Sequence, residues 1–154
     1  MLEDDYDVVG AFNTVYSKRG VIIDHVDNLL DLNYCLYENP GVDEYDLVLL
    51  DLAVNMPNLT TRDIREALPQ MPEYTTSFFD RIKLYGWDYY INIICKQDTT
   101  KKESAKKFIL ISGHAHLLQE QGIFSKEKYP SVRLIDKADK RLYDIISEII
   151  TQKN

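Results

Sequence analysis

The chain has 154 residues, of which 45% are hydrophobic and 28% are charged, and its formal net charge is −7. A chain of this length can bury one sizeable core, so a single domain over residues 1–154 is expected. The acidic balance argues against a nucleic-acid or anionic-membrane partner, because both need a basic surface. No apolar run approaches the roughly 20 residues that cross a bilayer. Two widely separated cysteines, Cys35 and Cys95, fit a reduced, cytoplasmic setting.

The first part of the chain reads as helix, strand, helix and strand. Residues 6–18 carry apolar side chains on one helical face, and the β-branched "VIIDHV" at 21–26 predicts a short strand. Asp27 can cap a following helix whose leucines recur at helical spacing. The continuous apolar run at 47–50 is typical of a strand buried on both faces, as in a parallel sheet.

The second part repeats the alternation less regularly. A short helix is expected near residues 60–68, followed by a longer aromatic helix through 78–96. Buried strands are expected at 108–112 and, more weakly, at 132–136. A last helix at 140–151 carries its isoleucines on one face. Strands alternating with amphipathic helices imply right-handed crossovers, so the predicted fold class is a doubly wound α/β parallel sheet.

Polar residues follow the predicted strands at their carboxyl ends. Asp51 ends the strand at 47–50, Ser112 ends the next one, and Lys137 follows the last. Residues 3–5 are all acidic and come just before the first helix. Ligands bind in the crevice at the carboxyl ends of the strands in such sheets, so these groups are expected to converge there.

Clustered carboxylates repel one another unless a cation lies among them. Hard oxygen ligands suit Mg²⁺, which accepts one or two carboxylates together with phosphate oxygens. A lysine would add a second positive charge, and a hydroxyl would hydrogen-bond a phosphoryl oxygen. One carboxylate would remain to act as a nucleophile, so the set indicates phosphoryl chemistry at this edge of the sheet.

Four segments together resemble the receiver domains of two-component response regulators. They are "LEDD" near the N-terminus, "DLVLLDL" around Asp51, "ILISG" around Ser112 and "LIDKAD" around Lys137, in the family's order. The resemblance covers nearly the whole chain. It implies a flavodoxin-like sheet of five parallel strands in the order 2-1-3-4-5.

The resemblance also implies a Mg²⁺ site. Glu3 and Asp4 would be the acidic pair that holds the ion, although Asp5 is an alternative member of that pair. Asp51 would add a carboxylate oxygen, and Ala53 would supply its backbone carbonyl. Mg²⁺ is therefore the expected cofactor.

By the same resemblance, the protein would be a signalling switch rather than an enzyme. Asp51 would accept a phosphoryl group from a histidine kinase or a phosphotransfer protein in a phosphorelay. Ser112 would be the switch hydroxyl, and Lys137 would contact the phosphoryl group. The output would pass through a downstream protein or an output domain absent from this chain.

The sequence departs from the family pattern at several points. Pro57 stands six residues after Asp51 rather than four, Leu134 replaces the switch aromatic, and Ala138 replaces a proline. The 61 positions between Asp51 and Ser112 indicate an insertion, around residues 52–75. Only Met1 and Leu2 precede Glu3, so the first strand would be truncated; pairing with a second copy by strand exchange could complete it.

Two other functions stay open. One is a degenerate receiver that keeps the fold as a protein-binding module without phosphorylation. The other is a metal-dependent phosphatase with Asp51 as nucleophile. The second is disfavoured because Ala53 stands where such enzymes commonly carry another aspartate.

Overall fold

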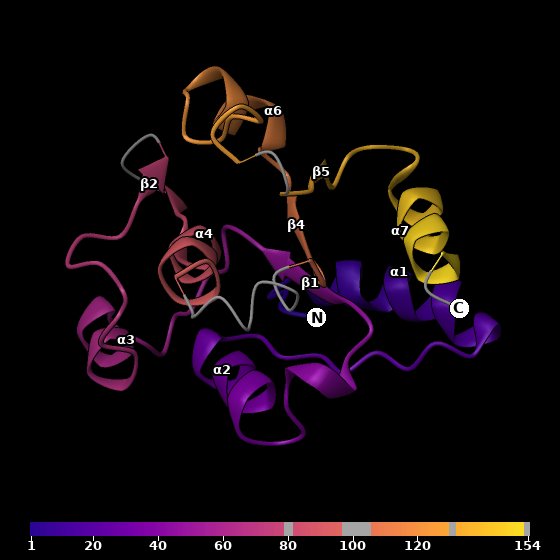
Figure 1. Cartoon of the computed structure of the whole chain (residues 1–154), viewed down its shortest axis with the longest axis horizontal. Helices are drawn as coiled ribbons and strands as arrows, with labels where there is room; N and C mark the ends of the chain where they lie inside the picture. The colour runs from indigo at the N-terminus through magenta and orange to yellow at the C-terminus, as the bar shows by residue number, and fades with distance from the viewer. Residues whose placement is uncertain (79–81, 97–105, 130–131, 153–154) are drawn as a thin grey trace.

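The structure is a computed structural model that describes residues 1–78, 82–96, 106–129 and 132–152. It is a mixed α/β fold with a three-stranded parallel sheet in the order β1-β4-β5 and a small antiparallel pair, β2-β3 (Figure 1). Within these ranges no helix is long and apolar enough to cross a membrane. The helices and strands are α1 Tyr6–Tyr16, α2 Leu29–Tyr37, β1 Val48–Asp51, α3 Thr61–Ala67, β2 Ser77–Phe78, β3 Ile82–Lys83, α4 Tyr85–Tyr89, π-helical η3 Tyr90–Ile94, β4 Phe108–Ser112, α6 Ala115–Glu120, β5 Leu134–Asp136 and α7 Leu142–Thr151.

The parallel sheet confirms the strands expected at 47–50, 108–112 and 132–136. Its register aligns the polar strand ends: Asp51 pairs with Ile111, and Ser112 pairs with Asp136. Every residue of β1 and β4 is buried, as expected for strands covered on both faces. The carboxyl ends of the three strands therefore meet along one edge.

Helices cover the two faces of this sheet. Because side chains alternate along a strand, Leu49 and Ile111 pack in a core cluster with the helices α1 and α7. Leu50 and Leu110 lie in the second cluster, which α2 and α4 help to form. The helices α1 and α7 lie side by side (Figure 1), where the Tyr16 hydroxyl donates to the Tyr143 carbonyl at 2.7 Å.

The amino terminus contributes a fragment of a strand. Leu2 makes parallel bridges to Leu50 on one side and to Val26 on the other. The Leu2 N–H donates to the Leu49 carbonyl at 2.9 Å, and the Asp51 N–H donates to the Leu2 carbonyl at 3.1 Å. The sheet is therefore extended beyond β1 by isolated bridges only.

The strand expected at 21–26 does not form, which corrects that prediction. Val26 alone is bridged, and residues 21–25 have no regular secondary structure. The physical reason is the neighbour: Met1 and Leu2 offer too few backbone groups to sustain a ladder along the whole segment. Three strands therefore stand where a sheet of five was expected.

Two helices begin close to where the sequence predicts, and the cap of one of them lies one residue later than expected. The helix expected after Asp27 is capped by Asn28, whose side chain accepts the N–H groups of Leu30 and Asp31. The short helix expected near 60–68 is α3, which begins with a capping box between Thr60 and Asp63.

The segment 52–75, interpreted as an insertion, contributes to the core. Leu52, Val54, Ile64 and Met71 are buried in the cluster that also contains Leu50. Deleting this segment would therefore remove packed side chains as well as surface.

The continuous helix expected through residues 78–96 is wrong in its first part. The segments Ser77–Phe78 and Ile82–Lys83 pair as strands, and helix begins only at Tyr85. A buried carboxylate fixes this boundary: Asp88 accepts the Thr76 N–H at 2.7 Å and the Thr76 hydroxyl at 2.6 Å. These bonds hold the extended chain before β2 against α4.

Asp88 gives a pH-dependent prediction. Burial raises the pKa of this carboxyl above its usual 3.8, although the Thr76 hydrogen bonds oppose the rise. The folded protein thus holds this proton more tightly than the unfolded chain, so stability falls as pH rises from about 4 through the folded pKa. We expect urea denaturation to show that the free energy of unfolding of the native protein falls over this pH range relative to that of Asp88→Asn. A difference in stability between the native protein and Asp88→Asn that does not change with pH would contradict it.

Candidate functional site

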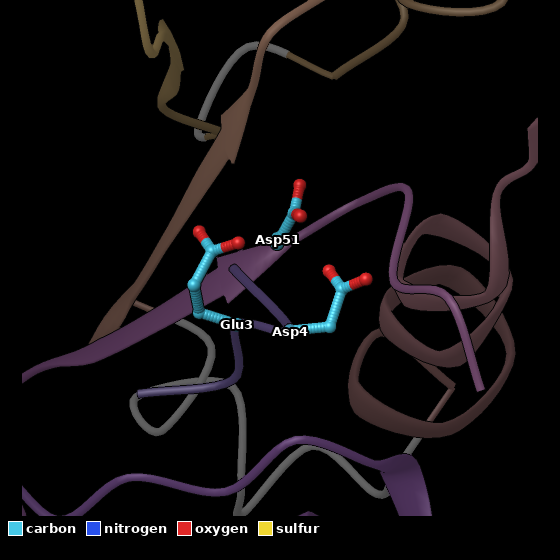
Figure 2. Close-up of side chains that lie close together, drawn as sticks. All are labelled: Glu3, Asp4 and Asp51. Carbon is cyan, nitrogen blue, oxygen red and sulfur yellow. The ribbon is translucent and has the colours of Figure 1, made fainter. Parts of the chain in front are cut away.

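Three carboxylates gather at the carboxyl end of β1. Asp51 ends that strand and is 3% exposed, and Glu3, which directly follows the bridged Leu2, is 0% exposed. Asp4 is half-buried beside them. One oxygen from each of the three lies within 4.8 Å of the others. Figure 2 shows the three carboxyl groups around one space beyond the end of the strand.

Lys137 joins two of these carboxylates. Its ammonium nitrogen Nζ donates to Glu3 Oε1 and to Asp51 Oδ2, both at 2.8 Å. The lysine follows β5, and its backbone N–H donates to the Ser112 carbonyl at 3.0 Å, which ties the turn to β4. The lysine is therefore held at the sheet edge by both backbone and side-chain contacts.

The charges of this cluster do not balance. The cluster has three carboxyl groups, and the one ammonium contacts two of them, Glu3 and Asp51. Burial and the neighbouring Asp51 raise the pKa of Glu3, and burial raises the pKa of Asp51 despite the lysine. Burial also lowers the pKa of Lys137, but the two carboxylates outweigh it and raise that pKa overall. The lysine is thus charged, and the two buried carboxyl groups hold a proton more tightly than exposed ones do.

Backbone groups orient the carboxylates. The Asn55 N–H donates to Asp4 Oδ2 at 3.0 Å, and the Ala53 N–H donates to Asp51 Oδ1 at 3.3 Å, so the loop after β1 wraps around the cluster. Asp5, the alternative ligand, is exposed and caps α1 by accepting the Asp7 N–H at 2.9 Å. The structure therefore brings Glu3 and Asp4, rather than Asp5, to Asp51.

Ser112 lies on the same edge without joining the ion pairs. It follows Ile111, the partner of Asp51 in the sheet, and it is fully buried. Its Oγ accepts the His114 N–H at 3.1 Å, and among the hydrogen bonds of the described residues none links Ser112 Oγ to Asp51. Its hydroxyl hydrogen remains available for donation.

Two contributors to the site had no clear sequence signal. His25 Nε2 lies 2.7 Å from the Glu3 carbonyl oxygen and so helps to fix the acidic segment. Gly86 packs directly on β1: its N–H donates to the Leu52 carbonyl at 3.1 Å, and a Cβ there would meet the Asp51 carbonyl oxygen at 2.0 Å. A glycine inside an aromatic helical run was the only hint of this close approach.

The donor set fits Mg²⁺. Its oxygens are carboxylates, the hard ligands that this ion prefers. Glu3 Oε2 is fully buried and makes no well-formed hydrogen bond, although it lies 2.7 Å from Lys137 Nζ. Hollows of about 260 and 450 Å³, lined in part by Asp4 and by Ala53, flank the loop after β1. The first hollow reaches the cluster at Asp4, and neither hollow is lined by Glu3 or Asp51.

No family model, curated protein or solved structure matches this chain. Its function must therefore be argued from the chemistry of the cluster.

Proposed function

We propose that the chain is a receiver-like signalling switch that accepts a phosphoryl group on Asp51 with the help of Mg²⁺. The observation that carries the proposal is the bridge from Lys137 to both Glu3 and Asp51, with Asp4 beside them. A lone acid at a strand end needs no such arrangement. An acid that receives a phosphoryl group needs neighbouring carboxylates that hold a metal ion. It also needs a cationic side chain that contacts the transferred phosphoryl group.

The order of contacts across the sheet supports the same interpretation. Val26 bridges Leu2, Leu2 bridges β1, and β4 and β5 follow, all in parallel. This order of contacts is compatible with the proposed flavodoxin-like order 2-1-3-4-5, although only β1, β4 and β5 form strands of the parallel sheet and Leu2 and Val26 contribute isolated bridges. The resemblance in "LEDD", "DLVLLDL", "ILISG" and "LIDKAD" falls on the segments that meet at the site.

The transfer step needs only the groups at this edge. An Asp51 carboxylate oxygen attacks the phosphorus, the bond from phosphorus to the donor breaks, and an acyl phosphate forms while the donor leaves with the bonding electrons. Glu3, Asp4, Asp51 and the Ala53 carbonyl would hold Mg²⁺. When bound, this ion offsets the charge on the transferring group.

The modified state would change two contacts. Lys137 Nζ would exchange its bond to Asp51 Oδ2 for a phosphoryl oxygen, and the Ser112 hydroxyl would donate its free hydrogen to another. Because the Ser112 Oγ also accepts the His114 N–H, its movement would shift the start of α6. Such contacts exist only in the modified state, so they supply the free-energy difference for a conformational change.

The direct test is labelling of the native chain by acetyl phosphate. We expect Mg²⁺-dependent incorporation that hydroxylamine removes, as for an acyl phosphate. A histidine kinase or phosphotransfer protein would be the protein donor, and a downstream protein would read the change at α6. If no donor labels the chain and beryllofluoride does not bind, the degenerate protein-binding module becomes the better interpretation.

Lys137→Ala should destabilise the metal-free protein. Removing the ammonium leaves Glu3 and Asp51 buried without their partner, and breaking a buried pair in this way costs about 3–5 kcal/mol. We expect Mg²⁺ to restore part of the loss. Labelling should persist, but the shift at α6 should be reduced. Urea denaturation with EDTA and with Mg²⁺ measures the first effect, and the exposed Lys140→Ala is the matched control. Equal stability of the two variants would contradict it.

A further inference from the structure

A hollow of about 450 Å³ lies beside the loop that follows β1, next to the acidic cluster but outside it. Three parts of the chain line it: the loop at 53–56, the segment 82–85 that runs from β3 into α4, and His114 just before α6. It therefore lies at the carboxyl edge of the parallel sheet, where ligands bind in open α/β sheets. Small-molecule sites have volumes of about 300–1,000 Å³, so this hollow is large enough for a small organic molecule.

The lining of this hollow combines apolar side chains with a few polar ones. Val54 and Met56 are buried in the core, and Ile82 packs against them from β3. The Tyr85 hydroxyl oxygen lies 3.1 Å from Thr61 Oγ1, which ties the α4 wall to α3. Mostly apolar walls with a small number of polar groups are typical of small-molecule sites.

The charge of the lining favours an anion. Lys83 is exposed and contributes an ammonium group, and no carboxylate is among the described lining residues. Within the described part of the chain Lys83 makes no ion pair. The neighbouring hollow of about 260 Å³ has the opposite character, because its described lining includes Asp4 and Asp27 but no lysine or arginine. The larger hollow thus suits a negatively charged ligand although the whole chain has a net charge of −7.

The surroundings of the hollow limit the charge of this ligand. The Ala53 N–H donates to Asp51 Oδ1 at 3.3 Å, so the carboxyl groups of the cluster lie just beyond the wall that Ala53 forms. They would repel a second negative charge, and the single ammonium of Lys83 balances one. A phosphate monoester carries a charge of about −1.5 to −2 at pH 7, whereas a carboxylate carries one negative charge. A carboxylate is therefore the better match.

We propose that this hollow binds a small organic carboxylate. The apolar body of the ligand lies against Val54, Met56 and Ile82, and its carboxylate accepts a hydrogen bond from the Lys83 ammonium. The ligand thereby joins the loop after β1 to the segment from β3 to α4. These groups are all present in the unmodified chain, so this binding depends neither on phosphorylation of Asp51 nor on Mg²⁺.

The test is a titration of the unmodified full chain with benzoate in EDTA, followed by the backbone amide shifts in nitrogen–proton NMR spectra. We expect saturable shifts at Ala53, Lys83 and His114, and no comparable shifts in α7. Acetate lacks the apolar body and benzyl alcohol lacks the charge, so each should bind more weakly than benzoate. Phenyl phosphate, which has the same ring and more negative charge, should also bind more weakly.

A charge-neutral variant tests the role of the lysine. Lys83→Gln should bind benzoate about fivefold more weakly, the upper range for an exposed ion pair, and should bind benzyl alcohol as the native chain does. Lys140 is also exposed but does not line the hollow, so Lys140→Gln should bind benzoate like the native chain. Benzoate that causes no saturable shifts, or shifts only away from the hollow, would overturn the proposal. So would equal affinity of Lys83→Gln and the native chain for benzoate, or benzyl alcohol or phenyl phosphate that binds as tightly as benzoate.

Discussion

Asp51→Asn is expected to abolish Mg²⁺-dependent phosphoryl labelling and to leave the protein folded. An amide oxygen is a poor nucleophile and carries no charge, so neither the acyl phosphate nor the metal site can form in the same way. Lys137 keeps its bond to Glu3 in the variant, so no buried ammonium is left alone. Labelling with acetyl phosphate measures the loss.

Asp51→Asn should be at least as stable as the native chain without metal, and less stable than the native chain with Mg²⁺. Burial disfavours the ionised form of Asp51, so the amide should be at least as stable as the native side chain in EDTA. In Mg²⁺ at about 100 times its dissociation constant, the native chain should gain about 2.7 kcal/mol and the variant much less. The exposed Asp43→Asn should behave like the native chain. If Asp51→Asn were labelled as strongly as the native chain, the phosphoryl group would have to be on another residue.

Gly86→Ala is expected to destabilise the protein through a steric clash under the site. The new Cβ would lie 2.0 Å from the Asp51 carbonyl oxygen and 3.0 Å from the Leu52 Cα. These are backbone atoms of a buried strand and its continuation, so no flexible side chain can yield. Overpacking of this kind typically costs about 1–3 kcal/mol, and a clash with backbone atoms places this substitution toward the upper end. It should also displace Asp51 and weaken Mg²⁺ binding.

The control for this substitution is Gly10→Ala. Gly10 lies in α1, and a Cβ there has no neighbour within 4 Å. Replacing a helical glycine with alanine stabilises by about 0.5–1 kcal/mol, so the two variants should change stability in opposite directions. Thermal unfolding of both proteins makes the comparison. A Gly86→Ala protein as stable as the native chain would mean that α4 does not pack on β1 as described.

Local patterns in the sequence correctly predicted the strands and helices that have a complete neighbouring element to pack against. The apolar runs at 47–50 and 108–112 became the buried strands β1 and β4, and the isoleucine face at 140–151 became α7. Each of these segments carries its own burial pattern. The segment 21–26 carries the same β-branched composition, but its neighbour in the sheet has only Met1 and Leu2 to offer. Strand formation depends on that neighbour, which composition does not reveal.

Tertiary contacts also limited what the sequence could predict around α4. The aromatic run through 78–96 is helical only from Tyr85, because Asp88 binds Thr76 and the preceding residues pair as β2 and β3. A hydrogen bond between residues that are twelve positions apart leaves no periodic pattern in the sequence.

The candidate site was easier to predict than the fold around it. Parallel strands bring their carboxyl ends to one edge, so Asp51 and Lys137 could be placed together from the order of the strands alone. The direct bond from Lys137 to Glu3, and the close packing of Gly86 under Asp51, depend on side-chain placement. Spacing in the sequence contains no such information.

Binding of beryllofluoride, a mimic of the phosphoryl group, tests the central proposal most directly. We expect fluorine NMR to detect a bound fluoride species with the native chain and Mg²⁺, and none without Mg²⁺ or with Asp51→Asn. Trp87, which follows Gly86 on α4 and is the chain's one tryptophan, should report the same event by a change in fluorescence. A native chain that binds no beryllofluoride at saturating Mg²⁺ would contradict the assignment of Asp51 as a phosphoacceptor.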